Sequence, residues 1–346
     1  MANKTIYSGK DFRIGIAPQS AFATANTTEA QFYELLITDS PQMDWGGLIR
    51  ESTKRSNSKR VKDNKDVFVQ TAGGTYTVSV SGVLTDTTVD LLVGGVMNDV
   101  ESEGASTPYT KVLEWDSSTT QPDFGGDSGQ MFTILLYSPA SEESIQLKTA
   151  VLQSLSISGD PGSNGGRLGF SATFYTGFAP TYSATATPSS WVTPATDYYI
   201  FQQAATKTVG GNAIVAGSFS VDFANGAARV GFDSSGNPET YSMGLGDGYA
   251  VSGEISAKYD PNTKDLIDTF LTNPQGGSAE SNIIMEWGTG GADGHLKFDF
   301  NALFTGNSQD FGNEAGVFVS LPFEGVDDGT NEAVEVTISN ATDRAW

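Results

Sequence analysis

The chain has 346 residues, which is long enough for two domains of ordinary size, and 38% hydrophobic residues suffice for a packed core. A formal net charge of −22 argues against nucleic-acid binding by phosphate neutralisation, which needs a basic face. The absence of cysteine excludes disulfides, thiolate catalysis and cysteine-ligated metal sites. Forty glycines, with many Thr, Ser, Val and Phe residues, favour β-structure with tight turns.

The N-terminal stretch MANKTIYSGKDF contains no apolar run, so we do not expect a secretory signal there. No segment reaches 18 uninterrupted apolar residues, and we therefore expect no membrane-spanning helix and no membrane partner.

A basic segment interrupts the acidic first half. Between Arg50 and Asp66 the chain carries seven basic residues and three acidic ones. The basic residues are Arg50, Lys54, Arg55, Lys59, Arg60, Lys62 and Lys65. A solvated loop is the ordinary interpretation of such a run, and it stays open. The segment lies between two predicted strands, one ending at Asp44-Trp45 and one covering Tyr76–Leu84, so we expect a long excursion from a β-pair.

Two segments are similar at an offset of 175 residues: YTVSVSGVLTDTTVDLLVGGVMN (Tyr76–Asn98) and VSGEISAKYDPNTKDLIDTFLTN (Val251–Asn273). Each has an alternating pattern that predicts a strand, followed by a turn and a short helix. In the second copy Asp260 is the expected N-cap and Pro261 the first helical residue. In the first copy Asp86 is the expected cap, and Gly94-Gly95 weaken the helix by about 1 kcal/mol each.

Two more segment pairs follow in the same order. The segment Gln42–Arg50 resembles Ser220–Arg229, with Asp44-Trp45 placed on Asp222-Phe223. The segment Gly165–Phe178 resembles Asn313–Val326 at an offset of 148, which places Phe170 on Phe318.

These repeats predict a mainly β fold, a tandem duplication of a β-sandwich or barrel in which each copy has one flanking short α-helix. The expected domains are residues 1–178 and 198–346. A linker rich in Pro, Thr and Ser joins them over 179–197, and the second domain ends in a strand at Ala333–Asn340.

Catalytic candidates are few. The stretch GGDSGQ (Gly125–Gln130) resembles the surroundings of a trypsin-like nucleophile, but the sole histidine, His295, follows Ser128, and Gln130 replaces the last glycine. We interpret the stretch as a turn and His295 as an ordinary residue at a strand start. The acidic turns at Asp160 and Asp327-Asp328 are compatible with weak calcium binding, or simply with solvated turns. We therefore predict no enzyme and no cofactor.

One family resemblance spans most of the chain. The early FRIGIAPQSAFATANT (Phe12–Thr27), the strand ending at Asp44-Trp45, the long polar excursion and the Tyr76–Asn98 segment follow one another in the order seen in tail tube (major tail) proteins of long-tailed bacteriophages. The second-half segments SFSVDFANGAARV and YAVSGEISAKYDPNTKDLIDTFLTN are similar to the same family.

The resemblance implies β-sandwiches whose sheets join around a ring, and rings that stack into a tube for genome ejection. With two tube domains per chain, it implies a three-subunit ring of pseudo-sixfold symmetry. The genome would pass through the lumen without specific binding, because an acidic wall repels DNA. Ser79, Ser81, Glu254 and Lys258 are candidates for the lumen wall.

The implied partners are other copies of the chain and other tail proteins: the tape measure, the tail terminator and the distal tail protein. The implied location is the virion tail, assembled in the bacterial host cytoplasm. In this setting the seven basic residues of Arg50–Lys65 become an inter-subunit or inter-ring contact that docks on acidic surface. The equivalent segment of the second half, Val230–Gly244, carries Asp233 and Glu239 and no basic residue.

Two alternatives remain from the residues alone. One is another phage structural protein, such as a capsid decoration or baseplate subunit. The other is a double β-sandwich that binds carbohydrate or calcium, since five tryptophans and twelve tyrosines could supply sugar-stacking faces.

Overall fold

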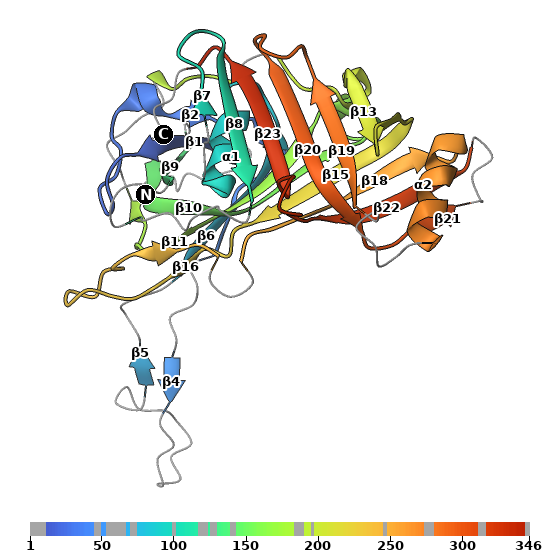
Figure 1. Ribbon diagram of the computed structural model, residues 1–346. Coiled ribbons are helices and arrows are strands. Elements are labelled where there is room, and N and C mark those ends of the chain that lie inside the picture. The colour runs from blue at the N-terminus through green and yellow to red at the C-terminus, as the bar shows by residue number, and fades with distance from the viewer. Residues whose placement is uncertain are drawn as a thin grey trace, which may run out of the picture.

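A computed structural model describes residues 12–44, 50–52, 67–69, 75–98, 102–116, 124, 130–138, 143–182, 190–194, 197–244, 248–272, 280–310 and 316–342. Strands dominate these residues, as the sequence predicts, and the two α-helices are α1 (Val89–Met97) and α2 (Pro261–Thr272) (Figure 1). Short 3-10 turns lie at Glu29–Gln31, Asn164–Gly166 and Phe201–Gln203.

Eight strands form one antiparallel sheet, which we call the long sheet. Its order is β3 (Gln42–Asp44), β6 (Tyr76–Val83), β11 (Gly169–Thr176), the C-terminal part of β10 (Glu143–Gly159), β15 (Ala216–Ala224), β18 (Ala250–Lys258), β22 (Phe318–Gly325) and β21 (Ser308–Asp310). The β10–β15 pair runs from Ser154 opposite Ala224 to Gly159 opposite Phe219, and it joins the two predicted domains.

Two further sets of strands lie on the other side of the core from the long sheet. One set is β2 (Tyr33–Glu34), β1 (Arg13–Gln19), β9 (Met131–Ser138), the N-terminal part of β10 and β12 (Thr181–Tyr182). The other is β7 (Ser102–Glu103), β8 (Tyr109–Trp115), β23 (Val334–Asn340), β20 (His295–Phe304), β19 (Glu280–Trp287), β13 (Thr206–Val209) and β14 (Asn212–Ala213).

Two small hairpins leave this body. Strands β4 (Arg50–Ser52) and β5 (Val67–Val69) pair with each other, as do β16 (Ala228–Arg229) and β17 (Tyr241–Ser242). Figure 1 shows β4 and β5 well apart from the main sheets.

Strand β10 belongs both to the long sheet and to the set that contains β1 and β9, because its backbone bends at the buried residue Thr149. Thr149 has a φ of 52°, in the left-handed region that β-branched residues rarely occupy. The buried Gln19 amide holds this point: its Oε1 accepts from the Thr149 N–H at 2.8 Å, and its Nε2 donates to Thr149 Oγ1 at 2.8 Å. The Thr133 hydroxyl also donates to Gln19 Oε1 at 3.0 Å.

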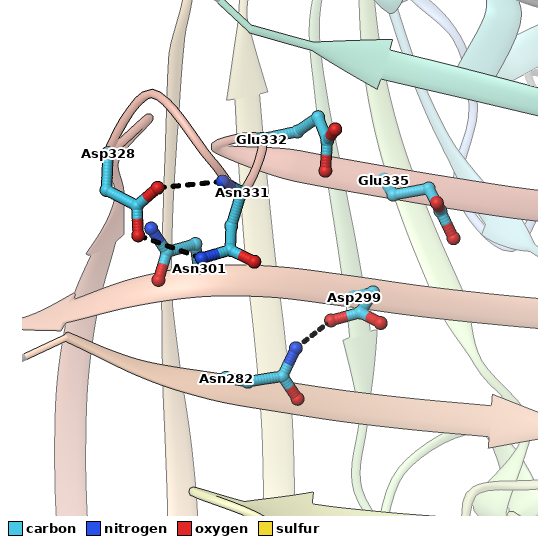
Figure 2. A pocket seen from close by; sticks show the side chains of 7 residues that line it. All are labelled: Asn282, Asp299, Asn301, Asp328, Asn331, Glu332 and Glu335. Atoms are coloured by element: carbon cyan, nitrogen blue, oxygen red, sulfur yellow. Dashed lines mark hydrogen bonds between the residues drawn. The ribbon is translucent and has the colours of Figure 1, made fainter.

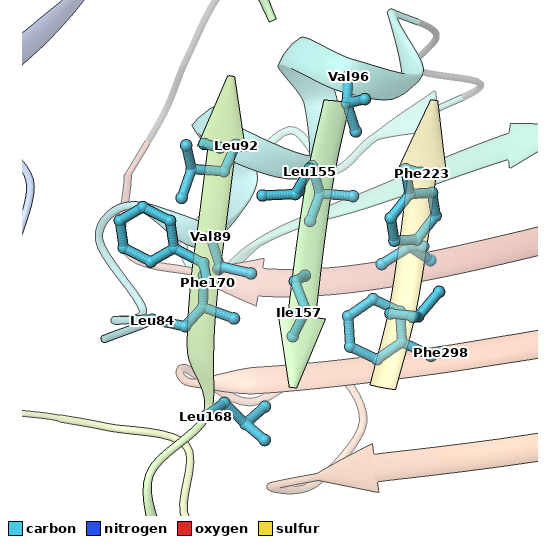
Figure 3. Close-up of a cluster of buried hydrophobic side chains, with 14 of the residues drawn as sticks. Leu84, Val89, Leu92, Val96, Leu155, Ile157, Leu168, Phe170, Phe223 and Phe298 are labelled. Carbon is cyan, nitrogen blue, oxygen red and sulfur yellow. The ribbon is translucent and has the colours of Figure 1, made fainter. Parts of the chain in front are cut away.

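The core lies between the long sheet and these two sets of strands. In Figure 3 the side chains of Leu155 and Phe170 project from β10 and β11 toward helix α1, and all nine residues of α1 are buried. A Cβ at Gly95 would lie 2.7 Å from the Phe132 ring, so the glycine that weakens the helix also lets it approach β9 closely. Trp115 of β8 packs edge-on against Phe223 of β15, with ring centroids 5.9 Å apart, so one core serves both predicted domains.

The helix starts differ in how well local sequence predicts them. The Thr263 N–H donates to Asp260 Oδ1 at 3.1 Å and Pro261 begins α2, as predicted. The prediction for α1 is wrong, because its N-cap is Thr88 and not Asp86. The turn Thr85–Thr88 precedes the helix, with the Val89 N–H donating to Thr85 O at 3.0 Å, and it leaves Asp86 too far upstream.

The strand registers allow the predicted matches between segments of the two halves to be checked. Asp44 lies opposite Thr77 and Asp222 lies opposite Ser252, in agreement with the predicted match of these segments. The match of Phe170 with Phe318 is off by one residue. Phe170 faces Gly82, whereas the residue that faces Ala257 is Val319. A slip of one position moves every side chain to the other face, and both Phe170 and Val319 are buried. The duplication itself and the domain boundaries stay predictions.

Part of the predicted linker lies against the first half. Trp191 stacks on Phe32 with ring centroids 5.8 Å apart, and the Val192 N–H donates to Phe32 O at 2.8 Å. A Cβ at Gly15 would lie 2.9 Å from the Trp191 ring, so this glycine makes room for the indole.

Candidate functional surface

The long sheet has one face that is almost entirely polar, opposite the face that packs on the core. One row crosses six strands from β6 to β22, and its members are Ser81, Ser171, Ser156, Asp222, Ser252 and Glu324. Neighbouring rows add Ser79, Thr173, Ser154, Ser158, Ser220, Glu254, Ser218, Ser256, Ser320 and Ser308. We call this set the serine face.

The strand pattern produces this face directly. Serine or threonine alternates with buried apolar residues, as in Ser79-Val80-Ser81 of β6 and Ser156-Ile157-Ser158 of β10. Since successive side chains of a strand point to opposite faces, every hydroxyl lies on the same side. Some bond across strands: Ser79 Oγ lies 3.2 Å from Thr173 Oγ1, and Ser81 Oγ donates to Ser171 Oγ at 3.3 Å.

The serine face carries negative charge. Asp222, Glu254 and Glu324 are exposed on it, and among the described residues no salt bridge of 4 Å or less involves them. Lys258, also exposed, lies near one edge at the end of β18. The four residues predicted for a lumen wall, Ser79, Ser81, Glu254 and Lys258, therefore share one face.

The two ends of the long sheet are open edges. Within the part of the chain that the structure describes, β3 pairs only with β6, and β21 pairs only with β22. An unpaired strand presents backbone N–H and C=O groups and is a ready template for another strand.

The predicted counterpart of the basic segment is an exposed hairpin. Strands β16 and β17 lead to a turn in which Asp233 Oδ1 accepts from the N–H groups of Ser235 and Asn237, both at 2.8 Å. The Arg229 guanidinium carbon lies 3.8 Å from the centroid of the Phe232 ring, and Val230 is 57% exposed. Phe232 is 38% exposed, so two large apolar side chains of this hairpin reach the surface.

The basic segment itself falls largely outside the described residues. Of its predicted contact residues only Arg50 is described, as backbone in β4. The structure therefore does not place Lys54, Arg55, Lys59, Arg60, Lys62 and Lys65.

An acidic pocket of about 350 Å³ lies over β19, β20 and β23 (Figure 2). Its lining residues are Asn282, Asp299, Asn301, Asp328, Asn331, Glu332 and Glu335. Lys297 offsets part of the charge, with its Nζ 2.7 Å from Asp299 Oδ2 and 3.4 Å from Glu335 Oε1. Asp328 closes its own turn, since its Oδ1 accepts from the N–H groups of Thr330 and Asn331, both at 2.7 Å.

The other chemical candidates that are described make local contacts. His295 begins β20, as predicted, and its Nε2 lies 3.1 Å from Glu286 Oε1. The hydroxyl of Thr206 donates to Glu286 and is the main cause that lowers the pKa of this carboxyl, with His295 contributing less. Asp160 Oδ1 accepts from the Gly162 N–H at 2.6 Å, which is a turn contact. Ser128 lies outside the described residues.

The tryptophans that the structure describes are core residues. Trp115, Trp191 and Trp287 are 3%, 6% and 3% exposed, so they offer no stacking platform to a sugar. Among the described residues no group of three or more His, Asp or Glu side chains is arranged to hold a metal ion, and no described helix is long and apolar enough to cross a membrane.

Sequence reasoning missed the buried polar groups where the two halves meet. Asn225 is fully buried after β15, and its Nδ2 donates to Leu152 O at 2.6 Å and to Val96 O at 3.1 Å. Lys111 of β8 is also fully buried and pairs with Asp90 of α1 at 2.7 Å. Only the strand pairing brings these distant residues together, so no local signal could have found them.

A family model described as a phage tail tube protein matches residues 9–325. The matched range contains the whole serine face and the β10–β15 pair at its centre. No curated protein matches the chain.

Proposed function

The chain belongs to the phage tail tube protein family and is a structural protein of the phage tail; we propose that its copies join side by side into rings, and that stacked rings form a tube whose bore is lined by the serine face. We propose further that the viral genome passes through this bore during ejection.

The serine face is the observation that carries the proposal. A wall that DNA slides along has to avoid strong attraction to phosphate. Serine and threonine hydroxyls are small and uncharged, and Asp222, Glu254 and Glu324 repel phosphate at distances up to the Debye length of about 8 Å at physiological salt. Two exposed cations lie near these residues: Lys258 at the end of its strand, and Arg167, which lines a hollow together with Ser220 and Glu254.

A ring of three chains accounts for the two halves. In each half a strand pairs with a second strand that leads to an α-helix: β3 with β6 before α1, and β15 with β18 before α2. Three such chains would supply six similar units around the axis. Assembly in the host cytoplasm, and contacts with a tape measure, a tail terminator and a distal tail protein, belong to the same proposal.

The basic segment Arg50–Lys65 would dock on acidic surface of an adjacent copy and steer assembly. The acidic pocket over β19, β20 and β23 is one surface of the required sign. Changing Lys54, Arg55, Lys59 and Arg60 together to Glu should abolish or strongly slow tube formation. The circular dichroism spectrum of the monomer should stay unchanged, which would show that the variant is folded. Normal tubes from this variant would refute this contact and leave the serine face untouched.

Self-assembly can be tested by negative-stain microscopy of the purified protein across salt and protein concentration. Rings or tubes of uniform diameter are expected, and monodisperse globules under all conditions would contradict the proposal.

The position of the serine face can be tested by chemical labelling, because the natural chain has no cysteine. In Ser252→Cys the thiol would react with a polymer-linked maleimide in the monomer but not in assembled tubes. Thr289→Cys, on the exposed loop that joins β19 to β20 at the end of these strands away from the acidic pocket, is the control and should react in both states. Equal labelling of Ser252→Cys in monomer and tube would place the serine face outside the bore.

A further inference from the structure

The β10–β15 pair inside the chain is a template for the joint between chains. We propose that β21 of one copy pairs antiparallel with β3 of the next, with Ser308 opposite Asp44 and Gln309 opposite Met43. This inference rests on the proposed function only in requiring that copies assemble side by side. Strand pairing and registers within one chain supply the rest of the argument.

The first step matches β3 to β15. Asp44 lies opposite Thr77 of β6, and Asp222 lies opposite Ser252 of β18. Thr77 and Ser252 are equivalent positions of the similar segments, which align at an offset of 175 residues. Asp44 and Asp222 therefore occupy equivalent places, each on the first strand of its half of the long sheet.

The second step matches β21 to the C-terminal part of β10. Each half contains a line of three serines that crosses three neighbouring strands. The lines are Ser81–Ser171–Ser156 in the first half and Ser256–Ser320–Ser308 in the second. Ser81 and Ser256 also align at the offset of 175, so Ser308 is the counterpart of Ser156.

The register of the new joint follows from these two matches. Inside the chain, Ser156 lies opposite Asp222 and Ile157 lies opposite Val221. Replacing each residue by its counterpart places Ser308 opposite Asp44 and Gln309 opposite Met43. Among the described residues β3 pairs only with β6 and β21 only with β22, so the proposed joint uses the outer edge of the strand at each end of the long sheet in every copy.

The side chains at both edges suit this register. Asp44 and Ser308 are exposed and belong to the polar face, whereas Met43 and Gln309 are half-buried and lie on the side of the core. The pairing would therefore place Asp44 beside Ser308 on the polar face, and Met43 beside Gln309 on the side of the core. Shifting by one residue would put Met43 on the polar face beside Ser308. The contact is head-to-tail, which closes into a ring when the rotation between copies permits.

Disulfide trapping tests the strands and the register together. Tubes assembled under reducing conditions from Asp44→Cys/Ser308→Cys would be oxidised and run on a non-reducing denaturing gel. Cross-linked species up to a closed trimer are expected. Met43→Cys/Ser308→Cys is the register control: its thiols point to opposite faces, and cross-linking should fall at least about tenfold, because a disulfide requires Cβ atoms about 4 Å apart.

The internal joint calibrates the geometry. Ser156→Cys/Asp222→Cys has the counterpart pair within one chain and should form an intrachain bond that leaves the protein monomeric on the gel. If this bond forms and microscopy shows tubes, but the Asp44→Cys/Ser308→Cys tubes do not cross-link, the proposed joint is wrong while the tube function stands. If the natural protein forms no tubes, the proposed function is wrong, and the joint that depends on assembly is wrong with it.

Should the double variant not assemble, the two single variants can be mixed before assembly. A cross-linked dimer from that mixture would support the joint, and tubes from the mixture without a dimer would overturn it.

Discussion

Replacing Lys111 with methionine should destabilise the fold by about 3–5 kcal/mol, the usual cost of removing one partner from a buried ion pair. Lys111 and Asp90 both have fully buried side chains, with Nζ 2.7 Å from Oδ2. Lys111 Nζ also donates to Asn340 Oδ1 at 3.3 Å and to Thr342 O at 2.9 Å. The amine therefore ties α1 and β8 to the end of β23, and its loss leaves a buried carboxylate without its cation.

The magnitude matters because a folded protein has only about 5–15 kcal/mol of stability in total. Urea unfolding of the monomer, followed by tryptophan fluorescence, would measure the loss for Lys111→Met, for Asp90→Asn and for the double variant. The double variant should be more stable than the sum of the two losses predicts, by about 1–3 kcal/mol, because neither charge is then left alone.

An exposed pair on α2 is the matched control. Lys264 Nζ lies 3.3 Å from Asp268 Oδ2, and both side chains are more than half exposed. Lys264→Met should leave the unfolding midpoint unchanged within error. Single losses below about 1 kcal/mol at the buried pair, combined with simple additivity, would refute the role given to Lys111.

Three further outcomes follow from the buried geometry. Gln19→Ala should cost about 2–4 kcal/mol in thermal unfolding, since it leaves the Thr149 N–H and its neighbours without their partner; a change below 1 kcal/mol would show that the bend of β10 does not need this amide. Gly253→Ala should cost about 1–3 kcal/mol, because a Cβ there would lie 2.5 Å from both Phe323 Cζ and Ser220 O; an unchanged melting temperature would contradict this close approach. Burial raises the pKa of Asp86 to about 6, so the folded state binds the proton more tightly than the unfolded state and loses stability as pH rises from about 4 to 6. Asp86→Asn should therefore stabilise the protein at pH 7 and lose that advantage at pH 4, and an equal effect at both pH values would exclude the titration of Asp86 as its cause.

Local signals in the sequence were reliable where the physics is local. The cap at Asp260 and the proline at the start of α2 depend on a few consecutive residues, and both are confirmed. The cap predicted at Asp86 failed because a turn at Thr85–Thr88 intervenes before α1, and the sequence alone does not say which of several polar residues closes that turn.

Register and burial were harder to predict because they depend on distant residues. Placing Phe170 on Phe318 relied on residue identity, whereas the backbone pairing puts Val319 there. The sequence of β8 gives no sign that Lys111 is buried, because the groups that accept from its amine, among them Asp90 and Asn340, belong to other elements.

The serine face could be predicted only in pieces. The alternation at Ser79 and Ser81 indicated a polar side of one strand, and Glu254 and Lys258 indicated another. That these strands share one continuous face follows from the pairing of β10 with β15, which no repeat in the sequence indicates.

A cryo-microscopy reconstruction of an assembled tube tests the central claim most directly. The account predicts three chains per ring, a continuous inner barrel, and Ser156, Asp222 and Ser252 facing the bore. A tube in which these residues face outward, or in which the long sheet does not line the bore, would contradict it.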